Sequence, residues 1–112
     1  YARKKLEMSR LYPAESRLFA NEIIQGAPRI RDVLAGELRT TMDNLAKVIE
    51  GWVQRGAIQP VHPYHLLFSI WSITQHYADF DQQVRAIMGE EDPFPGAEAH
   101  LEITIRRILT PV

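Results

Sequence analysis

Apolar side chains recur along the chain at the spacing of a helix. The clearest run lies within residues 32–55, where successive apolar positions follow steps of 4, 4, 3, 4 and 3 residues: Leu34, Leu38, Met42, Leu45, Ile49 and Trp52. Those steps keep one side of a helix apolar over about five turns. Gly56 then stands where a left-handed residue typically ends a helix. The pattern predicts one long helix from about Asp32 to Arg55.

The rest of the chain is also predicted to be helical. Pro13 and Pro63 are suited to open helices, because proline has no N–H to satisfy and its φ is already helical. Gly26 with Pro28 indicates a helix end, and the turn-rich acidic segment 89–96 separates the last two helices. We expect one helix already under way at residue 1, and others over about residues 13–25, 63–88 and 97–109. No strand-like alternation competes, so the predicted fold class is all-α with about five helices.

The segment 63–88 carries apolar residues on two opposite sides. One side combines apolar and aromatic residues with two polar ones: Tyr64, Leu67, Phe68, Trp71, Thr74, Gln75 and Ala78. The other side consists of Leu66, Ser69, Ile73, His76, Tyr77, Phe80, Val84 and Ile87. A helix that is apolar all round is buried all round. It is therefore either the central helix of its own domain or a helix that meets a second subunit, and we favour a homodimer.

The predicted dimer pairs this helix and the last helix with their counterparts in a second subunit. Two helices from each subunit would form a four-helix bundle across a two-fold axis, the commonest symmetry of oligomers. The last helix adds an apolar stripe formed by Leu101, Ile105 and Ile108, and Ile103 lies off this stripe. The expected interface consists of Ile73, His76, Tyr77, Phe80, Leu101, Ile105 and Ile108.

Trp71 and Gln75 lie one helical turn apart and close to Phe68 and Thr74. An indole offers a flat surface to a planar ring, and a carboxamide matches a ligand edge with N–H beside C=O, as in a lactam or a pyrimidine. These four residues are therefore candidates for a site that binds a small planar ligand. The alternative is an ordinary core, in which Trp71 is packed and Gln75 bonds to a neighbouring backbone carbonyl.

Composition narrows the classes of function. The 112 residues suit one domain, and 46% hydrophobic with 24% charged residues is typical of a globular protein. A net charge of −1 argues against nucleic-acid binding by this chain itself, and the run Arg3-Lys4-Lys5 is predicted to be the solvated side of a helix. The absence of cysteine excludes disulfides and thiol catalysis. No apolar run approaches the length of a membrane span and no signal peptide opens the chain, so we expect a cytoplasmic protein.

The sequence contains no recognisable catalytic or metal-binding pattern. His62 and His65 have no carboxylates beside them, so metal binding there is disfavoured. His76 is better suited to a hydrogen bond in an interface or core than to acting as a base, and Asp79 is predicted to be solvated or to pair with Arg85. Without a nucleophile–base pair or a phosphate-binding loop, we expect neither an enzyme nor a cofactor.

One motif resembles a known family. The segment Ile70-Trp71-Ser72-Ile73-Thr74-Gln75-His76-Tyr77-Ala78-Asp79-Phe80 resembles the signature helix of the Rut-type pyrimidine-utilisation regulators, which are TetR-family repressors. The similarity extends to Tyr12-Pro13, Ser16-Arg17-Leu18-Phe19, Gly26-Ala27-Pro28 and from Gly51-Trp52-Val53 to Pro63. It covers most of residues 1–88 and is weak over the acidic loop and the last helix. Ser72-Ile73 departs from the smaller residues expected there.

The resemblance implies a role in the control of transcription. TetR-family proteins place a helix-turn-helix domain, which contacts operator DNA, before the region that this chain resembles. We therefore expect residues 1–112 to form the C-terminal effector-binding and dimerisation domain of a longer protein. The resemblance places Trp71 and Gln75 where the family contacts its effector, uracil or thymine. The alternative that stays open is a helical homodimerisation module without a small-molecule pocket.

Overall fold

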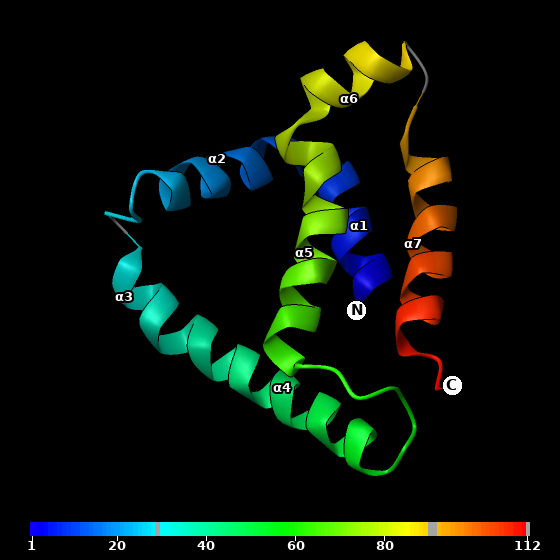
Figure 1. Cartoon of the computed structure of the whole chain (residues 1–112). Coiled ribbons are helices and arrows are strands. Elements are labelled where there is room, and N and C mark those ends of the chain that lie inside the picture. Colours follow the sequence, from blue (N-terminus) through cyan, green and yellow to red (C-terminus); the bar gives the residue numbers. More distant parts are fainter. Residues whose placement is uncertain (29, 90–91, 112) are drawn as a thin grey trace.

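The computed structural model describes residues 1–28, 30–89 and 92–111 (Figure 1). Every regular element in these residues is a helix: α1 (Ala2–Leu11), α2 (Pro13–Ile24), α3 (Arg31–Val33), the π-helical turn η1 (Leu34–Leu38), α4 (Arg39–Gln54), α5 (Pro63–Asp79), α6 (Asp81–Met88) and α7 (Phe94–Leu109). The predicted all-α class is confirmed. None of these helices combines the length and the apolar character that a membrane crossing requires.

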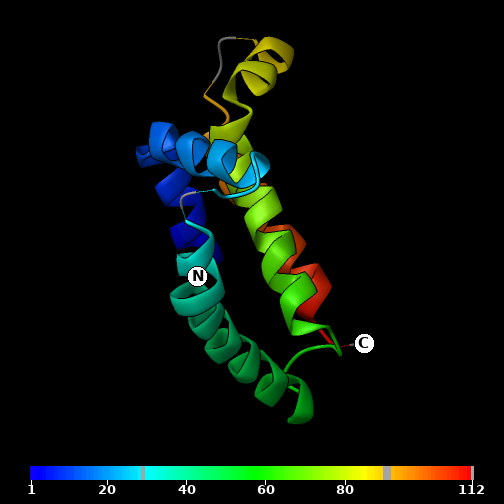
Figure 2. The ribbon, with the colours of Figure 1, turned by 90° about the vertical axis from the view of Figure 1, so that its left-hand side faces the viewer.

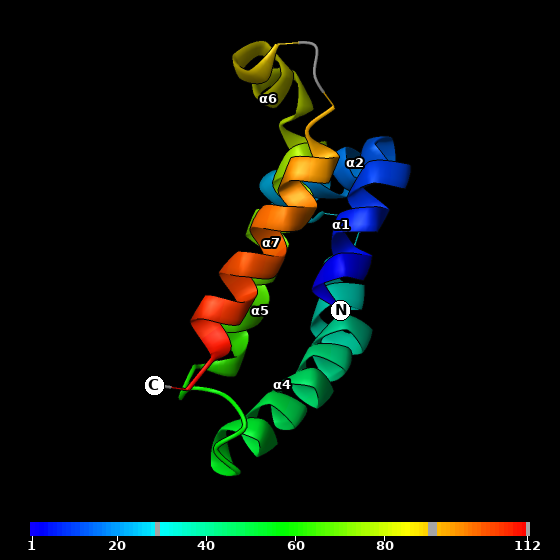
Figure 3. The same cartoon turned by 90° about the vertical axis from the view of Figure 1, so that its right-hand side faces the viewer.

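Helix α5 lies at the centre of the arrangement. It contacts α1, α2, α4, α6 and α7. In Figure 1, α2, α4 and α5 outline a triangle, α1 lies beside α5, and α7 runs antiparallel to α5. Figures 2 and 3 show that α7 follows α5 closely, whereas α4 lies across from both and approaches α5 only toward one end. The residues of α5 therefore decide most of the packing.

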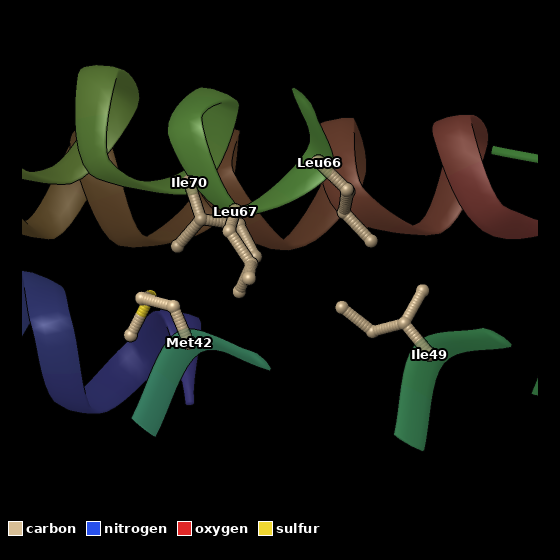
Figure 4. Close-up of a cluster of buried hydrophobic side chains, with 5 residues drawn as sticks. All are labelled: Met42, Ile49, Leu66, Leu67 and Ile70. Atoms are coloured by element: carbon tan, nitrogen blue, oxygen red, sulfur yellow. The ribbon is translucent and has the colours of Figure 1, made fainter. Parts of the chain in front are cut away.

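The main core forms where α5 meets α4. Leu66, Leu67 and Ile70 of α5 point toward Met42 and Ile49 of α4 (Figure 4). A separate, smaller cluster joins α1 to α7 through Leu6, Ala97 and Leu101. Of the apolar stripe predicted for residues 32–55, Leu38, Met42, Leu45 and Ile49 take part in this core. Trp52 is 40% exposed, and the side chain of Leu34 is outside the described part of the structure.

The long predicted helix forms, with one local deviation. Its first part contains the wider π-helical turn η1, which surrounds Gly36. The hydroxyl of Thr40 donates to the Gly36 carbonyl at 3.1 Å, and glycine within a helix weakens its regularity. At the other end Gly56 has a φ of 72°, and its N–H bonds to the Val53 carbonyl at 3.0 Å. The predicted glycine stop is therefore confirmed.

The prediction of one continuous helix over residues 63–88 is wrong, because the helix is interrupted at Phe80. That residue has φ −120° and ψ 33°, and α5 and α6 run in different directions on its two sides (Figure 1). In a continuous helix the Ala78 carbonyl would accept from the N–H four residues ahead. Here it accepts a hydrogen bond from the Arg17 guanidinium of α2 at 3.1 Å. A tertiary contact thus replaces the helical bond, and no proline or glycine marks the place.

Candidate ligand site on helix α5

Helix α5 has one buried stripe rather than two. The stripe consists of Leu66, Leu67, Ile70, Thr74 and Ala78, which combine members of both predicted sides. Trp71 and Ile73 are half-buried on the two edges of this stripe. The remaining side, which includes Phe68 and His76, is exposed in the chain by itself. The true buried direction lies between the two predicted ones, and α1, α2 and α4 are among the helices that contact α5.

Three of the four predicted ligand residues meet at one groove. Phe68, Trp71 and Gln75 line a shallow hollow of about 440 Å³ on the exposed side of α5. The Phe68 and Trp71 ring centroids are 5.5 Å apart, and the indole N–H donates to the Tyr1 hydroxyl at 2.9 Å. The Tyr1 contact fixes the orientation of the indole. The groove therefore presents an aromatic surface beside a carboxamide.

Thr74, the fourth predicted ligand residue, is placed elsewhere. Its side chain is fully buried in the core stripe. Its hydroxyl donates within its own helix, to the Ile70 carbonyl at 2.7 Å, with the Trp71 carbonyl at 3.3 Å. The projection assigned it to the Trp71 side because the two residues are three apart, but α5 turns that edge toward the core. Its hydroxyl is therefore committed to the helix backbone.

A second cleft, with polar residues and an apolar wall formed by Met8 and Phe19, adjoins the groove at Gln75. It lies between α1, α2 and α5 and includes Lys5, whose Nζ atom is 6.0 Å from the centroid of the Trp71 ring and lies over that ring. Burial lowers the pKa of Lys5, and the nearby Asp79 charge opposes that shift. Sequence reasoning missed Lys5 by assigning it to a solvated side. No local signal in the sequence marks Lys5, because its partial burial depends on how α2 and α5 pack beside α1.

Asp79 does not pair with Arg85, so that expectation is wrong. The Ser16 hydroxyl of α2 donates to Asp79 at 2.6 Å, and the Arg85 guanidinium bonds to Asp81 at 2.8 Å. The helix break at Phe80 separates Asp79 from α6, so the i,i+4 partner of Arg85 is the residue within its own helix. Asp79 therefore ties α2 to the end of α5, close to the groove.

The residues predicted for a dimer interface divide into two groups. His76 and Phe80 are exposed and stack, with ring centroids 5.1 Å apart, and Ile108 is 41% exposed. Ile73 and Tyr77 are half-buried against the α1–α7 cluster. The first group, unlike the second, presents much of its surface to solvent.

On α7 the predicted interface residues lie on two different sides: Ile108 is exposed, whereas Leu101 and Ile105 pack within their own chain. Leu101 is only 3% exposed and packs with Leu6 and Ala97 of its own chain, and Ile105 packs against both core clusters. Ile103, which the stripe excluded, is 51% exposed. In this chain the contact of α7 with α1 and α5 therefore occupies the side of α7 that carries Leu101 and Ile105.

Another hollow, with mainly apolar walls, opens between α1, α4, α5 and α7. Its volume is about 410 Å³, and its walls are mainly aliphatic and aromatic, with Leu45, Ile49, Trp52, Leu66, Ile105 and Leu109 among them. Arg3 and Arg106 stand at its rim, where both bond to the Glu102 carboxylate. No sequence argument singled out this hollow, because it forms only where residues of four helices meet.

No group of three or more potential metal ligands occurs among the residues that the structure describes. The His62 and His65 rings approach each other instead, with centroids 4.6 Å apart. His76 contacts the Tyr77 and Phe80 rings. These histidines therefore take part in aromatic contacts along the exposed side of α5.

Comparison of the amino-acid sequence with known proteins shows the family to which the chain belongs. The family model described as YcdC-like protein, C-terminal region, matches residues 1–111. Curated relatives named HTH-type transcriptional regulator RutR, from Escherichia coli strain K12, Escherichia coli O157:H7 and Shigella flexneri, are each 51% identical to this chain over 89 residues. The match covers 80% of this chain and 42% of each relative, so the chain corresponds to less than half of those regulators. The chain belongs to the TetR-type family of YcdC-like C-terminal regions.

Proposed function

We propose that this chain is the effector-sensing and dimerisation region of a TetR-family repressor, and that the effector is a pyrimidine such as uracil or thymine. The observation that carries the proposal is the groove where Trp71, Gln75 and Phe68 come together. The family match and the relatives named transcriptional regulators support the regulatory setting. The proposed role is regulatory rather than catalytic, in the cytoplasm.

The groove offers complementary chemistry to a pyrimidine. An aromatic ring can lie on the Trp71 indole, which the Tyr1 hydroxyl holds in place. The Gln75 carboxamide has no hydrogen-bond partner among the described residues, so its N–H and C=O are free to pair with a ring N–H and the adjacent carbonyl. The alternative, in which Gln75 bonds to a backbone carbonyl, lacks that bond in the described part of the chain.

The exposed side of α5 supports the dimer. Phe80 is 53% exposed and stacks on His76, and exposed aromatic residues that gather on one surface are typical of an interface. On α7, Ile108 is 41% exposed, and we include it in the proposed interface. In this arrangement α5 and α7 of each subunit would pack across a two-fold axis.

The proposed mechanism couples the ligand to DNA binding through the dimer. Operator DNA would be contacted by a helix-turn-helix domain outside this chain, in two half-sites about 34 Å apart. An effector that binds one arrangement of the subunits better than the other shifts their equilibrium by its difference in affinity, typically about 1–3 kcal/mol. Because α5 carries both the groove and the proposed interface, it is the element through which this coupling would pass.

Calorimetric titration of uracil into the full-length protein tests the proposal. Trp71→Ala and Gln75→Ala are each expected to weaken uracil binding by about tenfold or more, because a stacking surface or a paired hydrogen bond is lost. Gln83→Ala, an exposed glutamine on α6, is the matched control and is expected to bind like the wild type. Equal heats from all variants would disprove the site. A stable dimer that takes up no uracil would favour the plain dimerisation module.

A further inference from the structure

The cleft beside the Trp71 groove shares Gln75 with it. It has a volume of about 290 Å³, which is at the small end of ligand sites and suits a single ring. Gln75 lines both hollows, so a ligand that pairs with its carboxamide also reaches the residues of α1 and α2. Met8 and Phe19 provide apolar walls, and the polar residues around the cleft are Lys5, Ser9, Tyr12, Glu15, Ser16 and Gln75.

Lys5 is the cation of this cleft. Its ammonium lies over the Trp71 ring, 6.0 Å from the centroid, and its side chain is half-buried. Within the described residues it forms no ion pair, and no hydrogen bond from Nζ is found. Burial lowers the pKa of Lys5. A partly desolvated ammonium whose N–H groups have no protein acceptor is well suited to bind an oxygen atom of a ligand.

We infer that Lys5 is a further ligand-recognising residue, which makes the site selective for planar rings with a second carbonyl group, as in a cyclic imide. This inference rests on the proposed ligand site at Trp71 and Gln75. Gln75 would pair with the ring N–H and one adjacent carbonyl, while Lys5 donates to the other carbonyl. Glu15 in the cleft and Asp79 near Lys5 disfavour an anionic ligand, so the expected acceptor is a neutral carbonyl rather than a carboxylate.

Two probes separate this role from general binding. Uracil has an N–H between two carbonyls, whereas 2-pyridone has the same N–H beside one carbonyl and lacks the second. Both are titrated calorimetrically into the full-length wild type and into Lys5→Met. We expect Lys5→Met to weaken uracil binding about 10- to 100-fold, the usual effect of losing a hydrogen bond to a charged group, and to change 2-pyridone binding about threefold at most.

Matched variants keep the result interpretable. Lys4→Met removes the neighbouring, exposed lysine and is expected to leave both affinities unchanged. Lys5→Gln, which keeps a polar side chain but no charge, should reduce the preference for uracil in the same direction, and far-ultraviolet circular dichroism verifies that each variant is folded. If Lys5→Met weakens both probes equally, or neither, the inference is wrong while the Trp71–Gln75 site stands. If the wild type binds no uracil, both proposals are wrong.

Discussion

The two sides of α5 differ in packing far more than in polarity. On the buried side, Leu67 is 1% exposed and Ala78 is 0% exposed, and α1, α2 and α4 pack against the helix. On the other side, Phe68 and Phe80 are 46% and 53% exposed, although phenylalanine is as apolar as leucine. One side holds the helix in the fold, and the other carries the exposed aromatic and amide groups to which we propose that a ligand or a second subunit binds. We therefore expect substitutions on the packed side to change stability and substitutions on the exposed side to change binding or association.

The largest effect is expected on the buried side. Leu67→Ala removes a fully buried side chain from the α4–α5 core and leaves a cavity there, so we expect a loss of about 2–5 kcal/mol in the free energy of unfolding. Urea denaturation followed by circular dichroism measures it. Leu18→Ala on α2, where leucine is 73% exposed, is the matched control and should cost less than about 0.5 kcal/mol. Similar losses from both variants would contradict the contrast between packed and exposed apolar positions.

The exposed side is expected to control association instead. Phe80→Glu places a charge on the surface proposed for the dimer, so it should weaken self-association at least about tenfold, as loss of a central interface residue does. Sedimentation of the full-length protein over a range of concentrations measures this. Gln82→Glu, an exposed position close by on α6, adds the same charge and is expected to leave association unchanged. A Phe80→Glu variant that associates like the wild type would remove α5 from the interface.

The contrast also shows what a sequence can predict here. The long helix and its end at Gly56 follow from local signals, namely apolar spacing and a left-handed glycine, and both are confirmed. The direction in which α5 is buried cannot be predicted from such local signals, because apolar residues surround the helix. Which of them are buried depends on where the neighbouring helices pack. Leu101 shows the same limit, since its burial against Leu6 depends on where α1 lies. The cleft at Lys5 likewise forms only when three helices meet.

The break between α5 and α6 is a second feature that local signals do not contain. Arg17→Ala removes the guanidinium that bonds to the Ala78 carbonyl, so we expect a loss of about 0.5–1.5 kcal/mol in the free energy of unfolding. Urea denaturation measures it, with Arg107→Ala on the exposed side of α7 as the control that changes little. An Arg17→Ala variant as stable as the wild type would mean that the break is held by other contacts.

The smallest effect is expected at Thr74, where the two sides of α5 meet. Its hydroxyl donates to the Ile70 and Trp71 carbonyls, and valine would exchange that hydroxyl for a buried methyl group of similar size. The lost hydrogen bond, about 0.5–1.5 kcal/mol, and the gain from apolar burial, about 0.8 kcal/mol, nearly offset each other. We therefore expect Thr74→Val to change the free energy of unfolding by less than about 1 kcal/mol.

The affinity of Thr74→Val for uracil shows whether the Thr74 hydroxyl contacts the ligand or only the helix backbone. If its hydroxyl bonds only to the helix backbone, Thr74→Val removes no contact with the ligand. The variant should then bind uracil within about threefold of the wild type, which corresponds to a change of less than about 1 kcal/mol in the binding free energy. Thr74→Ala, which leaves a small cavity, should lower stability by about 0.5–1.5 kcal/mol and still retain binding. A tenfold loss of uracil affinity in a stably folded Thr74→Val variant would instead place the hydroxyl against the ligand. In that case the groove would have to extend beneath Trp71, into the stripe that the core now fills.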